Sequence, residues 1–123
     1  AMCWPNKVLA SDIDEIATET SKANADANGL SDRIEVITCA GFDHPKLRTA
    51  APYDLILANI LKGPLVALAP DMSQNSGNGG YVILSGLLNT QADAVIEAYL
   101  DVSFELVDHI NIAEWSILTF RKI

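Results

Sequence analysis

The sequence has little positive charge, no long apolar run and only two cysteines. Eight lysine and arginine residues stand against sixteen aspartate and glutamate residues, so the formal net charge is −8. Binding to nucleic acid needs a basic face, so this balance argues against a direct nucleic-acid partner and suits a basic protein partner. No apolar run approaches the roughly 20 residues that span a bilayer, and no charged-then-apolar leader is present. We therefore expect a cytoplasmic protein without a membrane segment.

Metal and disulfide chemistry have little support in the sequence. Cys3 and Cys39 lie far apart and form no CxxC pair, which favours two thiols in a reducing compartment. Neither cysteine stands at metal-ligand spacing from His44 or His109. No Ser-His-Asp set and no paired-carboxylate motif is present either. The sequence therefore predicts no metal site.

Apolar residues make up half of the 123 residues, which is enough for a core and argues against disorder. The length suits one domain, residues 1–123. Helical patterns alternate with apolar runs, and this alternation predicts an α/β fold with parallel strands. The short connection at 111–114 predicts that the last two strands pair antiparallel. The predicted strands are residues 7–12, 33–38, 53–59, 81–85, 104–110 and 115–121.

The first predicted helix has clear signals at both ends. Asp14 is suited to be its N-cap, and the Asn28-Gly29 pair is suited to end it, because glycine tolerates the left-handed conformation. Small residues recur at helical spacing, so the helix can approach a sheet closely. We expect its buried face to contain Ile16, Thr20, Ala23 and Ala27.

Prolines and glycines mark the remaining connections. Residues 44–52 are polar and contain two prolines, which predicts a connector with at most one helical turn. Residues 76–80, SGNGG, lack the following Lys-Ser/Thr of a phosphate loop and predict a turn. Thr90 can cap the last helix. A further helix is predicted from the apolar stripe of Leu65, Leu68, Ala69 and Met72. Pro70 lies inside this stripe and should kink the helix or start a second one.

Three predicted strands end in residues that could bind a ligand. Ligands of open parallel sheets bind outside the carboxyl ends of the strands. Asp12 could accept two hydrogen bonds from a ribose diol, Ile13 could pack on an adenine face, and Gly41 would let the backbone approach a base edge. Asn59 offers an acceptor and a donor, so it could hold an amine with its lone pair toward an electrophile. Simpler interpretations remain open: Asp12 as a strand-end residue that caps the next helix, and Asn59 as a turn residue.

Four segments carry a resemblance to a known family. They are LASDIDEIATETSKANADANGLSDRIEV (9–36), YDLILANILKGPLVALAP (53–70), LSGLL (84–88) before a helix with Gln-Ala, and Glu-Trp at 114–115. Together they resemble the class I S-adenosylmethionine-dependent methyltransferases. The resemblance is closer to the bacterial enzymes that methylate large-subunit ribosomal protein eleven. It covers nearly the whole chain, from Lys7 to Lys122.

The resemblance implies a Rossmann-like methyltransferase sheet, mostly parallel, with an antiparallel C-terminal hairpin. It also implies transfer of a methyl group from S-adenosylmethionine to a lysine or N-terminal amine of a ribosomal protein. By position, Asp12 would bind the cofactor ribose and Ile13 would lie beside the adenine. We also expect Gly41 at the cofactor, from the backbone approach that glycine permits rather than from the resemblance. Asn59 and Ile60 would lie near the transferred methyl and the substrate amine, with Asn59 in contact with both cofactor and substrate.

One departure from the family pattern limits these expectations. The family's first strand and glycine-rich loop, and its N-terminal substrate-recognition domain, have no counterpart in the sequence. The absent strand would lie between the strands at 7–12 and 53–59, so we expect a partial catalytic domain, truncated at its N-terminus. Its unpaired strand edges are an association hazard and predict a homodimer. Two alternatives stay open: a non-catalytic, self-associating domain without cofactor, and a methyltransferase of another protein or a small molecule.

Overall fold

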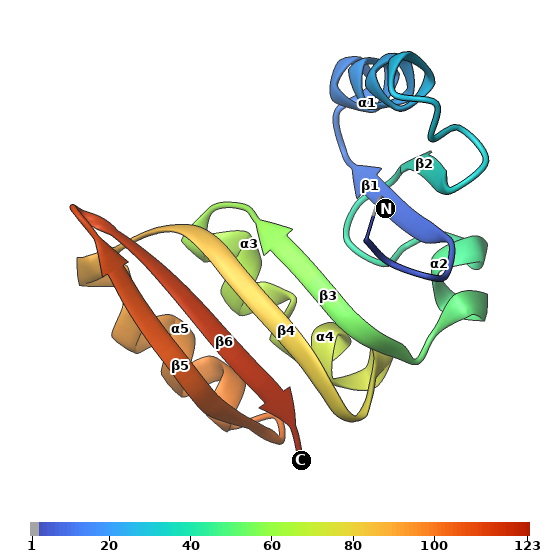
Figure 1. Ribbon diagram of the computed structural model, residues 1–123. Coiled ribbons are helices and arrows are strands. Elements are labelled where there is room, and N and C mark those ends of the chain that lie inside the picture. The colour runs from blue at the N-terminus through green and yellow to red at the C-terminus, as the bar shows by residue number, and fades with distance from the viewer. Residues whose placement is uncertain (1–2) are drawn as a thin grey trace. The chain divides into compact units, whose positions relative to one another are not determined.

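The computed structural model describes residues 3–123, and the chain divides into two compact units, Ala1–Thr49 and Ala50–Ile123 (Figure 1). Each unit has its own sheet. In the first unit two parallel strands flank a helix, and a short helix follows at the boundary. These elements are β1 (Val8–Asp12), α1 (Glu15–Ala27), β2 (Ile34–Thr38) and α2 (Pro45–Ala50).

The first unit is a β-α-β crossover, as the sequence predicts. β1 and β2 pair in parallel from Val8↔Ile34 to Asp12↔Thr38. The predicted N-cap is confirmed, because Asp14 Oδ1 accepts a hydrogen bond from the Ile16 backbone N–H at 2.9 Å. Beyond the other end of α1, Gly29 has φ +66°, the left-handed conformation in which glycine ends helices.

The predicted buried face of α1 is wrong. Thr18 and Ala25 are the buried residues of the helix, whereas Ile16 is 73% exposed. The physical reason is a polar contact with the sheet: Thr18 Oγ1 lies 2.7 Å from Thr38 Oγ1 at the end of β2. This bond turns the threonine side of the helix toward β2, and Ile16 points away from it.

The segment expected to be a connector contains a short helix instead. α2 has six residues, which is more than one turn. The backbone N–H groups of Leu47 and Arg48 both donate to the His44 carbonyl oxygen, and His44 Nδ1 accepts from the Lys46 N–H at 3.1 Å. His44 therefore caps a helix that buries Leu47, which overcomes the weak helical pattern of the sequence.

The second unit contains a mixed four-stranded sheet in the order β3-β4-β6-β5 (Figure 1). β3 and β4 are parallel, whereas β6 is antiparallel to both β4 and β5. The predicted C-terminal hairpin is thereby confirmed. The strands are β3 (Tyr53–Asn59), β4 (Ser76–Leu88), β5 (Phe104–Ile112) and β6 (Trp115–Lys122).

The run SGNGG belongs to β4, so the prediction of a simple turn is wrong. β4 begins at Ser76, which pairs with Tyr53, but the next pair is Leu55 with Tyr81. Four residues of β4 therefore bulge between the two pairs, with Gly79 at φ +78°. The glycines keep the flexible character that the sequence indicates, but within an irregular strand.

Helices cover one face of the second sheet (Figure 1). The helix that the sequence predicts around Pro70 is two helices, with Pro70 in the first turn of the second. The last helix starts after a 3₁₀ turn with Gln91 as its N-cap, so Thr90 is not the cap. The elements are α3 (Lys62–Ala67), α4 (Ala69–Asn75), η1 (Asn89–Gln91) and α5 (Ala92–Leu100).

An aromatic cluster forms the centre of the second core. The Tyr99 ring stacks on Phe120 at 5.1 Å between centroids and lies 5.7 Å from Phe104, and all three side chains are buried. The Tyr99 hydroxyl donates to the Leu65 carbonyl oxygen at 2.9 Å, so the one polar group of the cluster is satisfied. This bond ties α5 to α3.

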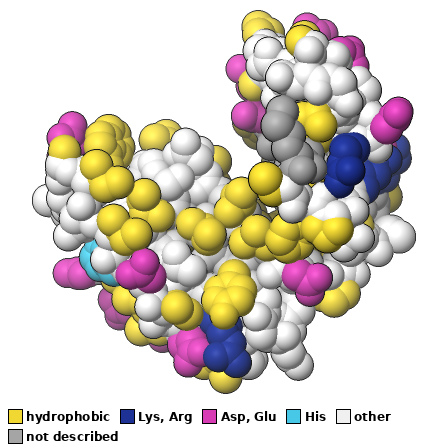
Figure 2. Space-filling view, in the orientation of Figure 1, with side chains coloured by type: hydrophobic (Ala, Val, Ile, Leu, Met, Phe, Trp, Pro, Cys, Tyr) yellow, Lys and Arg dark blue, Asp and Glu magenta, His cyan; other side chains and the backbone are white. Residues whose placement is uncertain are grey.

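No helix of the second unit covers the opposite face of this sheet, and hydrophobic side chains gather on it, as Figure 2 shows. Tyr81 and Ile83 are two residues apart on β4, so their side chains lie on the same face of the sheet. Their partners lie on that face too: Leu57 of β3 pairs with Ile83, and Arg121 of β6 pairs with Tyr81. We call it the uncovered face. Its five large hydrophobic side chains that are between 43% and 70% exposed are Leu57, Tyr81, Ile110, Ile112 and Trp115. In residues 3–123 no helix is long and apolar enough to cross a membrane.

Candidate active site

Asp12 ends β1 with its carboxylate already oriented. Its Oδ1 accepts a hydrogen bond from the Asp14 backbone N–H at 2.9 Å, and its carbonyl oxygen accepts from the Cys39 N–H at 2.9 Å. The second carboxylate oxygen has no hydrogen bond from residues 3–123, and the side chain is exposed. The turn therefore fixes the carboxylate and leaves one oxygen open to a ligand.

Ile13 and Gly41 lie beyond the carboxyl ends of the same two strands. β1 and β2 are parallel, so the segments after Asp12 and Thr38 leave the sheet at one edge. Ile13 is 74% exposed, so its apolar side chain is open to a ligand. Gly41 has φ +54° in a tight turn in which the Asp43 N–H donates to the Ala40 carbonyl at 2.9 Å. The first unit thus brings Asp12, Ile13 and Gly41 to one edge.

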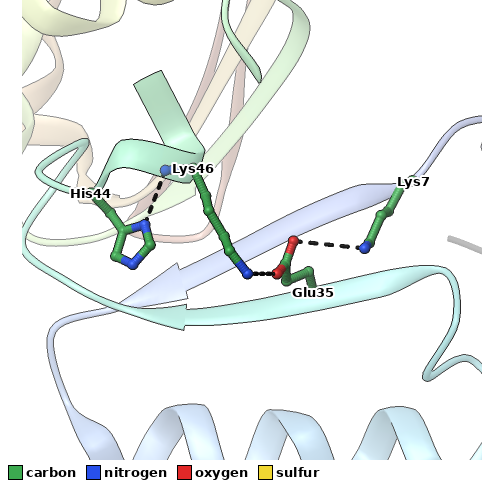
Figure 3. Close-up of polar contacts among 4 residues, drawn as sticks. All are labelled: Lys7, Glu35, His44 and Lys46. Carbon is green, nitrogen blue, oxygen red and sulfur yellow. Dashed lines mark hydrogen bonds and ion pairs between the residues drawn. The ribbon is translucent and has the colours of Figure 1, made fainter. Parts of the chain in front are cut away.

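Two titratable groups of the first unit have structural roles. Partial burial raises the pKa of the Cys39 thiol, and the negative charge of Asp43 adds to the effect, while a hydrogen bond with Ser11 opposes it. The thiol is therefore a poor nucleophile at neutral pH. The Lys46 ammonium bonds to Glu35 of β2 and, with Lys7 at 3.6 Å, lowers the pKa of the Glu35 carboxyl (Figure 3). These exposed ion pairs link α2 to β2.

Asn59 and Ile60 lie at the carboxyl end of β3, in the second unit. Asn59 pairs with Ser85 of β4, and its side chain is exposed. Ile60 is 37% exposed, and the next residue, Leu61, is the N-cap of α3. The Asn59 amide has no hydrogen-bond partner within the described part of the chain, so its acceptor and both its donors are open.

Gly86 is a residue of this region that sequence reasoning missed. It follows Ser85 in β4, has φ +80°, and lies directly against the Asn59 side chain. A Cβ at position 86 would stand 2.2 Å from Asn59 Oδ1 and 3.4 Å from the Ile60 carbonyl oxygen. A glycine inside an apolar strand is a signal for such close approach, and it was available in the LSGLL segment.

The predicted site residues therefore form two groups, each in its own unit. Asp12, Ile13 and Gly41 belong to the first unit, and Asn59 and Ile60 to the second. Within residues 3–123 no three His, Cys, Asp or Glu side chains cluster in a way that could hold a metal ion. The first group offers an open carboxylate oxygen and an exposed apolar side chain, and the second offers a side-chain amide.

A family model described as "Ribosomal protein L11 methyltransferase (PrmA)" matches residues 2–123. The chain belongs to this family. The resemblance stated from the sequence is thereby confirmed, and so is membership of an enzyme class, the methyltransferases.

Individual members of the PrmA family agree with this assignment. The ribosomal protein L11 methyltransferase of Mesorhizobium japonicum is 48% identical over 100 residues, which are 81% of this chain and 34% of that protein. The enzyme of the same name from Brucella suis is 47% identical over 95 residues, which are 77% of this chain and 33% of that protein. The chain thus spans about one third of the length of the curated relatives it matches.

A solved member of the PrmA family confirms the fold. The crystal structure of a ribosomal protein L11 methylase from Lactobacillus delbrueckii subsp. bulgaricus superposes with a TM-score of 0.86 at 28% sequence identity. The match covers 95% of this chain and 59% of that one. The predicted Rossmann-like α/β methyltransferase fold is therefore correct. The prediction that 1–123 is a single partial catalytic domain stays a prediction.

Proposed function

We propose that this chain acts as an S-adenosylmethionine-dependent N-methyltransferase on a ribosomal protein, at a lysine or N-terminal amine. The observation that carries the proposal is the Asp12 carboxylate. One of its oxygens is held by the Asp14 N–H, and the other is open, next to the exposed Ile13. The two side chains stand together at a strand end, which is where ligands of parallel sheets bind.

The first unit's residues suit the nucleoside part of the cofactor. The open oxygen of Asp12 would accept hydrogen bonds from the ribose hydroxyls, and Ile13 would cover one face of the adenine. The backbone at Gly41 would approach the base edge, because glycine itself has no side chain. Packing the base on Ile13 would also remove apolar surface from water, which favours binding by about 25 cal/mol for each Å² of apolar surface buried.

The second unit's residues suit the amine. The cofactor supplies a methyl group bound to a positively charged sulfur. The substrate nitrogen must first give up a proton to solvent; then its lone pair forms the N–C bond while the C–S bond breaks. Asn59 Oδ1 would accept a remaining N–H of the amine and so aim the lone pair, and Ile60 would help to exclude water. Placing reactants in line can supply much of the rate enhancement.

The charge of the chain suits this substrate class. Ribosomal proteins bind RNA and are basic, whereas the chain carries a net charge of −8. Attraction between opposite net charges speeds encounter, with a strong dependence on ionic strength. Methylation of a ribosomal protein would take place in the cytoplasm.

The test is calorimetric titration with S-adenosylhomocysteine, followed by a methylation assay. We expect binding by the wild-type chain, and weaker binding by Asp12→Ala than by Asp32→Ala, a variant that removes an acidic residue from the turn before β2. Mass spectrometry of ribosomal protein L11 after incubation with chain and cofactor should show methylated amines. Absence of binding at millimolar ligand would sink the proposal.

A second candidate function rests on the uncovered face. Five large hydrophobic side chains are between 43% and 70% exposed there, and patches of that kind mark interaction surfaces. The alternative is a non-catalytic domain that associates with itself through this face and binds no cofactor. The same titration separates the two candidates, because only the methyltransferase binds S-adenosylhomocysteine.

A further inference from the structure

Gly86 and Asn59 are packed so closely that no other residue fits at position 86 without moving the amide. β4 loses its regular register with β6 between Leu84 and Leu87, and Gly86 lies in that irregular stretch with φ +80°. Its Cα faces the Asn59 side chain from the neighbouring strand. An added Cβ would stand 2.2 Å from Oδ1 and 3.4 Å from Cγ of Asn59.

Gly86 thus meets two separate requirements, a left-handed backbone and an absent side chain. A second glycine of the same strand meets only the first. Gly79 has φ +78°, and an added Cβ there would meet nothing within 4 Å. Substitution of either glycine by alanine imposes similar backbone strain, so the two variants differ mainly in the contacts of the added Cβ. The severe one is the approach to Asn59 Oδ1, because the Ile60 carbonyl oxygen at 3.4 Å is at an ordinary contact distance.

We infer that Gly86 is a positioning residue that sets the orientation of the Asn59 amide. The clash that alanine would introduce is with the free end of a side chain that has no hydrogen-bond partner in residues 3–123. The amide is therefore the group that yields, by rotating about its side-chain torsions, while the β3–β4 pairing persists. The functional consequence rests on the proposed role of Asn59, since a rotated amide no longer aims the substrate nitrogen.

The geometric part of the inference is tested without any ligand. Nuclear magnetic resonance of ¹⁵N-labelled chain reports the side-chain amide signals of Asn59, assigned with Asn59→Ala. We expect these signals to move in Gly86→Ala and to stay in place in Gly79→Ala. Equal behaviour of the two glycine variants would overturn the inference, because it would leave backbone strain as the only role of Gly86.

Folding of the variants supplies a second check. If Gly86→Ala does not fold, truncation of Asn59 should relieve the clash, so the double variant Asn59→Ala/Gly86→Ala should recover a folded state. Failure of the double variant to fold, with Gly79→Ala folded, would show that position 86 serves the backbone alone. That result would also overturn the inference.

The functional part uses the methylation assay. A misplacement of about 1 Å can lower a rate roughly 100-fold, so we expect a drop of this order in kcat for Gly86→Ala. In the Asn59→Ala background, Gly86→Ala should not lower kcat any further. A further loss there would overturn the inference. A wild-type chain without activity would refute the proposed function, whereas the amide signals would still decide the contact between Gly86 and Asn59.

Discussion

Thr18 of α1 and Thr38 of β2 share a hydrogen bond between their hydroxyl oxygens, 2.7 Å apart, and this bond sets which side of α1 lies against the sheet. Thr18 is 2% exposed, and its hydroxyl also reaches the Glu15 carbonyl oxygen at 2.9 Å. The end of β2 that Thr38 occupies is the start of the segment that contains Gly41. The pair therefore anchors the helix beside the edge where the candidate cofactor residues lie.

Replacing Thr18 by valine should destabilise the first unit. The substitution keeps the shape and removes the hydroxyl, so we expect a loss of about 1 kcal/mol in the free energy of unfolding. The control is Thr20→Val, since Thr20 is exposed on the same helix and bonds only to the Ile16 carbonyl oxygen at 3.0 Å. Native-state hydrogen exchange of the α1 amides measures both. Equal protection in the two variants would contradict the anchoring role.

Most of the strands and the ends of α1 were predictable because their signals are local. Continuous apolar runs place the strands, and β3 has the bounds expected from YDLILAN. Asp14 and Gly29 set the ends of α1 through bonds and torsions that involve neighbouring residues only. Where a feature depends on a few adjacent residues, pattern and propensity suffice.

The face of α1 and the glycine bulge were not predictable because they depend on contacts distant in sequence. α1 has no strong apolar stripe, so a polar pair twenty residues apart decides its rotation. The run at 76–80 reads as a turn until β3 pairs with Ser76 and draws it into a strand. The contact of Gly86 with Asn59 likewise exists only once β3 and β4 lie side by side.

Asp12→Asn should separate the structural from the binding role of Asp12. The asparagine Oδ1 can still accept from the Asp14 N–H, so the turn and the thermal stability should be preserved. The loss of charge weakens hydrogen bonds to ribose hydroxyls, because bonds to charged groups contribute about 1.5–3 kcal/mol. We expect an affinity for S-adenosylhomocysteine at least about 10-fold lower by titration calorimetry. Unchanged affinity would show that Asp12 only shapes the turn.

The uncovered face should make the chain associate with itself. Leu57 lies on β3 in this face and is 70% exposed, so Leu57→Glu places a charge in any contact that the face makes. The control is Leu100→Glu, at the end of α5, where the leucine is 49% exposed. In sedimentation velocity we expect dimers of the wild type and of Leu100→Glu, and monomers of Leu57→Glu. A wild type that stays monomeric at high concentration would contradict the homodimer.

Tyr99 should make the second unit sensitive to alkaline pH. Burial raises the pKa of its hydroxyl above the usual value of 10, because the phenolate would lose water without gaining a partner. The neutral hydroxyl donates to the Leu65 carbonyl oxygen. Ionisation is thus easier in the unfolded chain, so the stabilisation is complete below pH 10 and is lost as the pH rises above it.

Tyr99→Phe keeps the ring against Phe104 and Phe120 and removes the hydroxyl. At neutral pH we expect a loss of about 1 kcal/mol, since the Leu65 carbonyl loses its buried donor. Above pH 10 the wild type should lose stability faster than the variant, so the two curves of unfolding free energy against pH converge. Tyr81→Phe, at a tyrosine that is 43% exposed, is the control and should run parallel to the wild type. Denaturant titrations at several pH values measure all three, and parallel curves for Tyr99→Phe and wild type would show that the buried hydroxyl does not govern alkaline unfolding.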